Sequence, residues 1–227
     1  MKNNHTWVIC AYGESEFLEA CILSLQAQTL PSKIICYSST PLDSIKQLCQ
    51  KYGIPFYTKE GGGIGRDWNN ALSFVETPYA TIAHQDDYYE PAYLEAVMQK
   101  IEQSKDVLIA YTDYFEEKNG VKILANTNLK IKTFMLKTLN LMPASRFWRN
   151  RVLAFGNPIS CPAVTYNLEA LSDFRFDEEM RVSLDWYAWY KISAYKGCFA
   201  YISKKLMCHR IHGDSETTKK IGRAHVW

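Results

Sequence analysis

The sequence predicts an α/β fold, in which a mostly parallel sheet carries helices on both faces and an irregular C-terminal portion follows. The first observation behind this prediction is an alternation, through the first half, of short apolar runs with segments of helical periodicity. The second is composition: 47% of the 227 residues are apolar and 22% are charged, so one well-buried core is expected. Strands joined by helices run parallel through right-handed crossovers, which places helices on both faces of the sheet.

The elements of the first half follow this alternation in order. Apolar runs predict strands at residues 6–11, 33–38, 54–58, 79–84 and 107–113. Apolar residues at helical spacing predict helices through residues 18–25, 45–52, 68–75 and 94–101. In a parallel sheet ligands bind at the carboxyl ends of the strands, so the residues that follow each strand are the first candidates for a site.

The second half is less regular. The expected elements are a hairpin at residues 116–123, a strand at 162–167, an aromatic helix at 184–197, a strand at 199–203 and a polar tail at 206–218. No internal repeat or linker divides the chain, so we expect a single domain spanning residues 1–227.

Net charge and cysteine content limit the class of protein. A formal net charge of +2 argues against a nucleic-acid partner, although residues 146–152 (RFWRNRV) form one short basic and aromatic stretch. Seven cysteines without a CxxC pair predict buried, reduced thiols, as is typical of a cytoplasmic protein. No segment resembles a secretory signal or approaches the roughly 18 apolar residues of a membrane span, so at most a peripheral contact with a membrane is expected.

Two adjacent carboxylates follow the fourth predicted strand. Asp86 and Asp87 come directly after the apolar run that ends at His84. Acids at the end of a buried strand are costly unless a cation compensates their charge, and Mg²⁺ or Mn²⁺ takes carboxylate ligands. The alternative is that they cap a helix starting near Pro91. Their position after a buried strand favours the metal site.

A glycine run, residues 60–71 (EGGGIGRDWNNA), precedes the third predicted helix. Glycines ahead of a helix permit a close approach of the backbone to phosphate, but this spacing is not a dinucleotide-binding fingerprint and the run follows the third strand. Arg66, Asn69 and Asn70 are placed to reach a nucleotide. A flexible loop with an exposed polar helix start is the alternative.

Asp185 and a late basic cluster complete the candidates. Asp185 stands near the start of an aromatic helix, and by itself it is typical of an acid favoured by the helix dipole. His209, Arg210 and His212 lie close together and suit a diphosphate, the alternative being that they are solvated. The sequence contains no GxSxG motif and gives no support for a serine or a Cys–His nucleophile.

Taken in order, these motifs resemble the family 2 glycosyltransferases with a GT-A fold. The resemblance covers residues 7–30 (WVICAYGESEFLEACILSLQAQTL), 63–97 (GIGRDWNNALSFVETPYATIAHQDDYYEPAYLEAV), 183–193 (SLDWYAWYKIS) and 209–218 (HRIHGDSETT). It implies an inverting transfer of a sugar from a nucleotide-diphosphate donor to a hydroxyl of a glycan or lipid-linked acceptor, with Mn²⁺ or Mg²⁺. It also implies a nucleotide-sugar-binding half (1–112), an acceptor-side half (113–227) and a cytoplasmic location that extends to the inner face of the membrane.

The resemblance further implies roles for individual residues. Asp185 matches the general base that takes the proton of the acceptor hydroxyl. The predicted contacts to the nucleotide-sugar are Ala11, Tyr12, Glu14, Ser39, Arg66, Asn70, Asp86, Asp87 and Arg210. The predicted metal ligands are Asp86, Asp87 and His212, with Asp86 as the first choice.

The chain departs from the family pattern at two places. The family often ends its second strand with Asp-Asp-Gly-Ser, whereas this chain has YSST (Tyr37 to Thr40), so a carboxylate that would contact the base is missing and the identity of the nucleotide is left open. His84 stands where family members often carry Asp, which predicts weaker metal binding.

Three other functions compete with that of a glycosyltransferase. A GT-A domain that only binds a nucleotide-sugar or a glycan would not need Asp185 beside intact metal acids. A sugar-nucleotide pyrophosphorylase would carry a G-x-G-T-R-like loop after its first strand, where this chain has AYGESEF. A metal-dependent phosphatase is expected to place its aspartates after an early strand, and no aspartate follows the first one.

Overall fold

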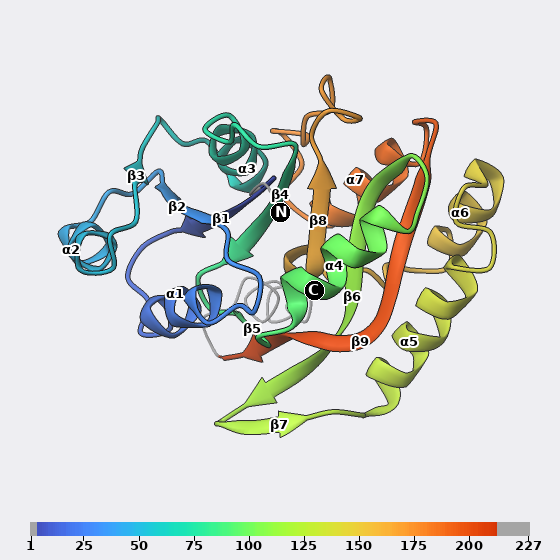
Figure 1. Cartoon of the computed structure of the whole chain (residues 1–227), viewed down its shortest axis with the longest axis horizontal. Coiled ribbons are helices and arrows are strands. Elements are labelled where there is room, and N and C mark those ends of the chain that lie inside the picture. Colours follow the sequence, from blue (N-terminus) through green and yellow to red (C-terminus); the bar gives the residue numbers. More distant parts are fainter. Residues whose placement is uncertain (1–3, 213–227) are drawn as a thin grey trace, which may run out of the picture.

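The computed structural model describes residues 4–212, and they contain one sheet with the strand order β3-β2-β1-β4-β8-β6-β9-β5, with β7 paired to β6 (Figure 1). The strands are β1 (His5–Ala11), β2 (Lys33–Ser38), β3 (Phe56–Tyr57), β4 (Tyr79–His84), β5 (Tyr88–Tyr89), β6 (Val107–Lys118), β7 (Val121–Ile123), β8 (Val164–Asn167) and β9 (Cys198–Ile211). The helices are α1 (Leu18–Gln26), α2 (Asp43–Lys51), α3 (Ile64–Leu72), α4 (Tyr93–Glu102), α5 (Thr127–Leu139), α6 (Arg146–Leu153) and α7 (Leu184–Ile192), with a short 3₁₀ turn at Cys161–Ala163.

Helices cover both faces of the sheet, as predicted. One core lies under α1, α2 and α4, and another lies under α5, α6 and α7. Side chains alternate along β1: Trp7 and Ile9 belong to the first core, whereas Val8 packs with Ala71 of α3 on the opposite face. The apolar alternation of the first half therefore reflects strands buried on both sides.

The sheet is mixed rather than purely parallel. The pairs β1–β2, β1–β4, β2–β3 and β6–β9 are parallel, whereas β4–β8, β6–β8, β5–β9 and β6–β7 are antiparallel. Every antiparallel pair involves β5, β7 or β8, which lie outside the strand–helix alternation of the first half. Helical crossovers therefore give the predicted parallel pairing among β1, β2, β3 and β4, whereas strands reached without such a crossover pair antiparallel.

The C-terminal portion is more regular than expected. Two helices, α5 and α6, occupy a stretch where the sequence predicted none. The periodicity of α5 is blurred because it buries Leu129, Leu136 and Leu139 but exposes Ile131 and Phe134 on its outer side. The expected short strand at 199–203 continues as β9 through Ile211, so residues predicted as part of a polar tail belong to the sheet.

The cysteines and helices also bear on the predicted class of protein. All seven cysteines are free; six are buried, as predicted, whereas Cys10 is partly exposed. None of the helices described for residues 4–212 combines the length and the apolar character that crossing a bilayer requires.

A fully buried histidine opens β1. The Nδ1 atom of His5 lies 2.8 Å from Ser32 Oγ, and its Nε2 atom lies 2.9 Å from Thr81 Oγ1, so hydroxyl groups hold both ring nitrogens. Burial lowers the pKa of His5 from 6.5 to about 3, because a charged imidazolium would lose its hydration. The folded protein therefore keeps His5 neutral.

We expect the folded state to lose stability in mild acid because of His5. Its folded pKa lies below its unfolded pKa, so its contribution is complete above about pH 6.5 and falls as the pH decreases towards 3. Between pH 7 and pH 5 the loss should be on the order of 1–2 kcal/mol, measured by urea unfolding at each pH. A His5→Gln variant should be less stable at pH 7 but should show a flatter pH dependence. Equal pH dependence in both proteins would contradict the assignment.

Candidate active site

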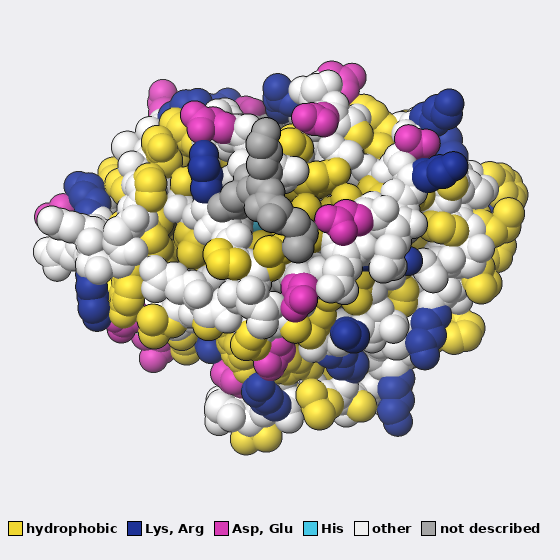
Figure 2. Space-filling view, in the orientation of Figure 1, with side chains coloured by type: hydrophobic (Ala, Val, Ile, Leu, Met, Phe, Trp, Pro, Cys, Tyr) yellow, Lys and Arg dark blue, Asp and Glu magenta, His cyan; other side chains and the backbone are white. Residues whose placement is uncertain are grey.

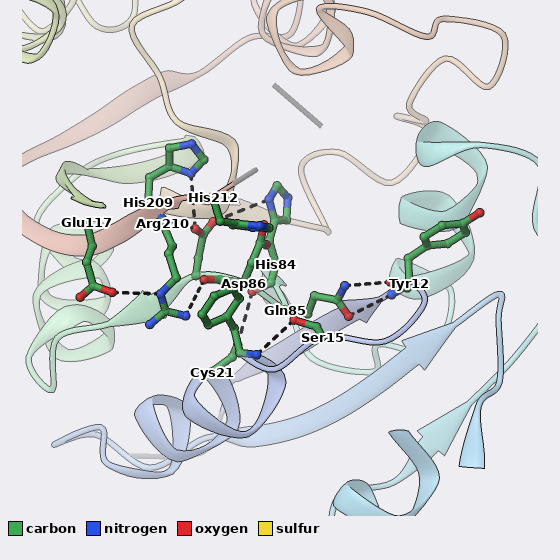
Figure 3. Close-up of polar contacts among 12 residues, drawn as sticks. Tyr12, Ser15, Cys21, His84, Gln85, Asp86, Glu117, His209, Arg210 and His212 are labelled. Atoms are coloured by element: carbon green, nitrogen blue, oxygen red, sulfur yellow. Dashed lines mark hydrogen bonds and ion pairs between the residues drawn. The ribbon is translucent and has the colours of Figure 1, made fainter. Parts of the chain in front are cut away.

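A cluster of acids and histidines lies where β4, β5 and β9 meet (Figure 3). Asp86 and Asp87 form the turn between β4 and β5, and β5 pairs with β9 so that Tyr88 lies opposite Cys208. The residues that follow Cys208 are thereby brought to the two acids. The start of α4 is capped by Gln28, whose Oε1 atom accepts from the backbone N–H of Leu94 (3.0 Å), and not by either aspartate, so the alternative that these acids cap a helix is wrong.

Asp87 is the most deeply buried member of the cluster, with 1% of its side chain exposed. Its Oδ1 atom accepts a hydrogen bond from the backbone N–H of Arg210 (3.0 Å) and lies 3.3 Å from His209 Nδ1. Its Oδ2 atom lies 3.8 Å from His84 Nδ1 and has no hydrogen-bond partner. A buried carboxylate oxygen without a partner is costly, which indicates that the site is built to receive a further group.

Asp86 is held by the same part of β9. Its Oδ2 atom lies 2.9 Å from His212 Nε2, and its backbone carbonyl accepts from Arg210 Nη1 (2.9 Å). Burial alone would raise the pKa of Asp86, but the charge of His84 and the hydrogen bond with His212 outweigh it, so the pKa lies below its ordinary value. Asp86 is therefore ionised at neutral pH.

Acidic side chains in turn hold the two basic partners, Arg210 and His209. The Nε atom of Arg210 donates to Glu117 Oε1 on β6 (3.0 Å), and the guanidinium lies over the ring of Phe17 at 4.3 Å. Burial alone would lower the pKa of His209, but the carboxylates of Asp87 and Asp86 outweigh it and the pKa is raised. Acids and bases of this cluster thus stabilise each other's charged forms.

Three of these side chains have the arrangement of a cation site. Ligand atoms of His84, Asp86 and Asp87 all lie within 4.8 Å of one another, and His84 Nε2, like Asp87 Oδ2, is buried without a hydrogen-bond partner. The ring of His84 is stacked on Trp68 of α3, with centroids 5.6 Å apart, which fixes its orientation. Two carboxylates and an imidazole fit a divalent cation. His84, which departs from the family pattern, is thus one of the three possible ligands. His212 is not one of the three but contacts Asp86.

A second polar group lies at the carboxyl end of β2, beside the start of α3. Ser39 Oγ donates to Asp67 Oδ2 (3.0 Å), and the hydroxyl of Tyr37 donates to Asp67 Oδ1 (3.3 Å). Asn70 Nδ2 donates to the Tyr37 hydroxyl at 3.1 Å. The pKa of Asp67 is raised by burial, which outweighs these hydrogen bonds. Sequence reasoning missed Asp67, because only the fold brings this first-turn residue of α3 to the end of β2.

The glycine run serves close packing around this second group. A Cβ on Gly61 would lie 2.7 Å from Ser39 Cβ, and a Cβ on Gly65 would lie 2.1 Å from the carbonyl oxygen of Asp177. Arg66 does not face the polar group; its Nε donates to Glu178 Oε2 at 2.8 Å. This run therefore joins α3 to the loop that precedes α7.

The loop after β1 lies between the two groups. Ala11 ends β1 and is buried, whereas the side chain of Tyr12 is 67% exposed and Glu14 is exposed. The side chain of Gln85 accepts from the backbone N–H of Tyr12 (3.1 Å) and donates to its carbonyl (2.8 Å). In Figure 3 the ring of Tyr12 points away from Asp86. This loop is thus tied to the acidic turn while its aromatic ring is free to contact a ligand.

Asp185 lies in the first turn of α7, where its Oδ2 accepts from Asn157 Nδ2 at 2.7 Å. The preceding Ser183 has a left-handed backbone conformation (φ 54°), which is strained for serine. Burial raises the pKa of the Cys161 thiol well above its ordinary value, and the charges of Asp185 and Asp87 add to this. The charges of Asp185 and Asp87 therefore both act on this buried thiol.

Lys132 of α5 also reaches this region, which sequence reasoning did not predict. Its Nζ donates to the Tyr114 hydroxyl at 2.8 Å. Burial lowers the pKa of Lys132, while the charges of Glu116 and Asp185 oppose this, and Lys132 in turn opposes protonation of His209. The sequence analysis predicted no helix around Lys132, so nothing in the sequence indicated that its side chain lies near the site.

Comparison with known proteins identifies a family and a set of structural relatives. Residues 6–157 match the family model described as Glycosyl transferase family 2. The curated protein glycosyltransferase GlyA of Streptococcus pneumoniae serotype 4 is 24% identical over 123 residues, which cover 51% of this chain and 18% of that protein.

The solved structures that resemble this chain include TarS of S. aureus and a mannosyltransferase of Pyrobaculum calidifontis. TarS 1–349 of S. aureus has a TM-score of 0.72 at 16% identity, covering 91% of this chain and 60% of its own; its complex with UDP-GlcNAc has a TM-score of 0.69. The mannosyltransferase PcManGT of Pyrobaculum calidifontis, in complex with GDP-Man and Mn²⁺, has a TM-score of 0.72 at 11% identity, covering 97% of this chain and 61% of its own. These likenesses show the shared GT-A fold, and the chain spans less than two thirds of each relative's length.

We expect Asp86→Asn to weaken binding of Mn²⁺ alone by about tenfold or more, because it removes both a ligand and a charge. The measurement is electron paramagnetic resonance of free Mn²⁺, which does not depend on turnover. Glu16→Gln is the matched control, since Glu16 is an exposed acid of the nearby loop outside the donor group. His84→Ala should also weaken binding. Unchanged Mn²⁺ affinity in Asp86→Asn would show that the turn is not a metal site.

Proposed function

Because this chain belongs to glycosyl transferase family 2, we propose that it transfers a sugar from a nucleotide-diphosphate donor to a hydroxyl of a glycan or lipid-linked acceptor, with inversion at the anomeric carbon. The observation that carries the proposal is the Asp86–Asp87 turn, with its unpartnered carboxylate oxygen, at the carboxyl end of β4. Relatives of the same fold were solved with UDP-GlcNAc, with UDP, and with GDP-Man and Mn²⁺, which supports a nucleotide-sugar donor.

Asp86, Asp87 and His84 would hold the divalent cation, with His212 beside Asp86. When bound, Mn²⁺ or Mg²⁺ supplies positive charge next to the leaving diphosphate. An imidazole donor suits transition metals, whereas Mg²⁺ prefers oxygen ligands alone, so the donor group favours Mn²⁺. Arg210 adds a fixed positive charge, since Glu117 and the Asp86 carbonyl hold its guanidinium.

Asp67 would replace the carboxylate that the end of β2 lacks. Its two oxygens lie beside Ser39 and Tyr37. An ionised carboxylate there accepts hydrogen bonds only and would therefore suit the ring N–H group of uracil (N3) or guanine (N1). Tyr12 would cover the nucleoside from the loop after β1, because its ring is exposed and the next residue, Gly13, donates its backbone N–H to Thr40 Oγ1 near the end of β2 (2.8 Å). Ala11, Glu14 and Asn70 complete the expected donor contacts.

Asp185 would act as the general base on the acceptor hydroxyl. Asn157 donates to its Oδ2 atom, which orients the carboxylate. Its charge, like that of Asp87, acts on the buried thiol of Cys161, and α7 belongs to the half that is expected to bind the acceptor. Glu178, an alternative base, is paired with Arg66 and Asn69. Asp185 beside intact acids favours an enzyme over a domain that only binds a nucleotide-sugar or a glycan.

Residues 1–112 would bind the donor, and residues 113–227 would bind the acceptor.

The free cysteines support a location in the reducing cytoplasm.

The test of this function begins with a thermal-shift panel of nucleotide-sugars with and without Mn²⁺, which identifies the donor; a ligand at 100 times its dissociation constant stabilises by roughly 2.7 kcal/mol. With that donor, Asp185→Asn should lower the transfer rate by roughly 10²–10⁴ while leaving binding of the nucleotide diphosphate unchanged, because this acid need not touch the nucleotide. Asp173→Asn, an exposed acid nearby in sequence, is the control. Wild-type turnover in Asp185→Asn would assign the base elsewhere, and loss of nucleotide binding would make Asp185 structural.

We expect Asp67→Asn to weaken binding of UDP or GDP by about five- to a hundredfold, because an amide cannot replace a carboxylate as a pure acceptor. The effect should appear in the donor KM more than in kcat, the pattern of lost ground-state binding. Titration calorimetry with both nucleotides measures it, and Asp43→Asn on α2 is the control. If the affinities of both nucleotides stay the same, Asp67 does not contact the base.

A further inference from the structure

A basic and apolar surface covers the outer side of α5 and α6, opposite the side of α5 that reaches the candidate site. We name it the α5–α6 surface. Its exposed apolar side chains are Ile131, Phe134, Leu141, Met142, Phe147 and Phe155. Its exposed basic side chains are Lys130, Lys137, Arg146 and Arg151. Figure 2 shows hydrophobic side chains gathered at the right-hand edge, over α6, with Lys and Arg side chains below them along α5.

The sequence of this region has no acidic residue. Residues 118–168 contain no Asp or Glu, although the whole chain has a formal net charge of only +2. The basic residues in this stretch are Lys118, Lys122, Lys130, Lys132, Lys137, Arg146, Arg149 and Arg151. Positive charge is therefore concentrated in this segment, and the rest of the chain carries a net negative charge.

The basic groups of the surface are not used by the fold. Within residues 4–212, none of its four Lys and Arg side chains forms an ion pair. By contrast, buried Arg149 donates to four backbone carbonyls, and Lys132 is bonded to Tyr114. Arg151 lies over the exposed ring of Phe147 at 5.2 Å, so charge and apolar area are adjacent.

The exposed face of α5 combines basic and aromatic side chains. Lys130, Phe134 and Lys137 are spaced at i, i+4 and i+7, so they share one face. Leu129 and Leu136 are buried on the other face. Long basic side chains beside aromatic rings suit a membrane surface, where the rings enter the boundary between headgroups and acyl chains and the charges meet anionic lipids.

We propose that the α5–α6 surface docks this protein on an anionic lipid bilayer. The occupant follows from charge: in a twofold dimer built on this surface, the basic groups of one copy would face those of the other, with no acid in the segment to separate them. A bilayer that carries negative headgroups complements the whole surface. The proposal does not depend on the proposed transfer reaction.

Vesicle co-sedimentation tests the docking. The chain is expected to bind vesicles of equimolar phosphatidylcholine and phosphatidylglycerol but not phosphatidylcholine alone, and added salt should weaken binding by screening. The triple variant Lys130→Glu/Lys137→Glu/Arg151→Glu should lower the partition coefficient by about tenfold or more. A Phe134→Ser/Phe147→Ser variant should also lower it, because it removes the apolar contact. The control is Leu23→Ser/Lys46→Glu on α1 and α2, at the opposite end of the molecule in Figure 1.

Circular dichroism and thermal unfolding show whether every variant keeps its fold, and neither depends on a ligand. Four outcomes would overturn the proposal: no binding of the unchanged chain to anionic vesicles, equal binding to neutral vesicles, an equal loss in the control, or undiminished binding in both surface variants. Sedimentation equilibrium covers the competing occupant. A dimer that the surface variants dissociate would assign this surface to a second copy of the chain.

Discussion

Burial of the Asp87 carboxylate is the constraint on which the candidate site depends. A carboxylate this deeply buried needs compensating partners, and local sequence cannot supply enough of them. The pairing of β5 with β9 brings the backbone N–H of Arg210 and the ring of His209 to Asp87. Asp87 and Arg210 are 123 residues apart in the chain. The site therefore exists only when the last long strand has joined the sheet, which links folding of the C-terminal portion to chemistry at the end of β4.

Much of the first half could be predicted from the sequence, because its structure follows from local periodicity. The apolar run of β4 followed by two acids was sufficient to place Asp86 and Asp87 at a strand end. The course of β9 was not predictable in the same way. Exposed Lys204 interrupts its apolar run, and most of its support comes from parallel pairing with β6, a strand far away in sequence. A local pattern therefore gave a short strand and a tail where the molecule has one strand of 14 residues.

The residues that sequence reasoning missed share a physical reason: they reach the site from elements that carry no motif of their own. Asp67 of α3 lies against Ser39 just after β2, where the sequence itself has no carboxylate. Lys132 approaches from a helix whose pattern is blurred by its exposed apolar side. His84 was visible as a departure from the family pattern, but its orientation depends on stacking against Trp68. A single sequence does not show which side chains the fold brings together from distant elements.

The double hydrogen bond between the side chain of Gln85 and the backbone of Tyr12 has a consequence for how the site fills. Gln85 is the residue between His84 and Asp86, so the acidic turn and the loop after β1 are fastened together. A ligand that immobilises either segment leaves less conformational entropy for the other to lose. We therefore expect the cation and the nucleotide to reinforce each other's residence, and by reciprocity to loosen each other on departure. Through this one glutamine, loss of either the spent nucleotide or its ion would weaken binding of the other.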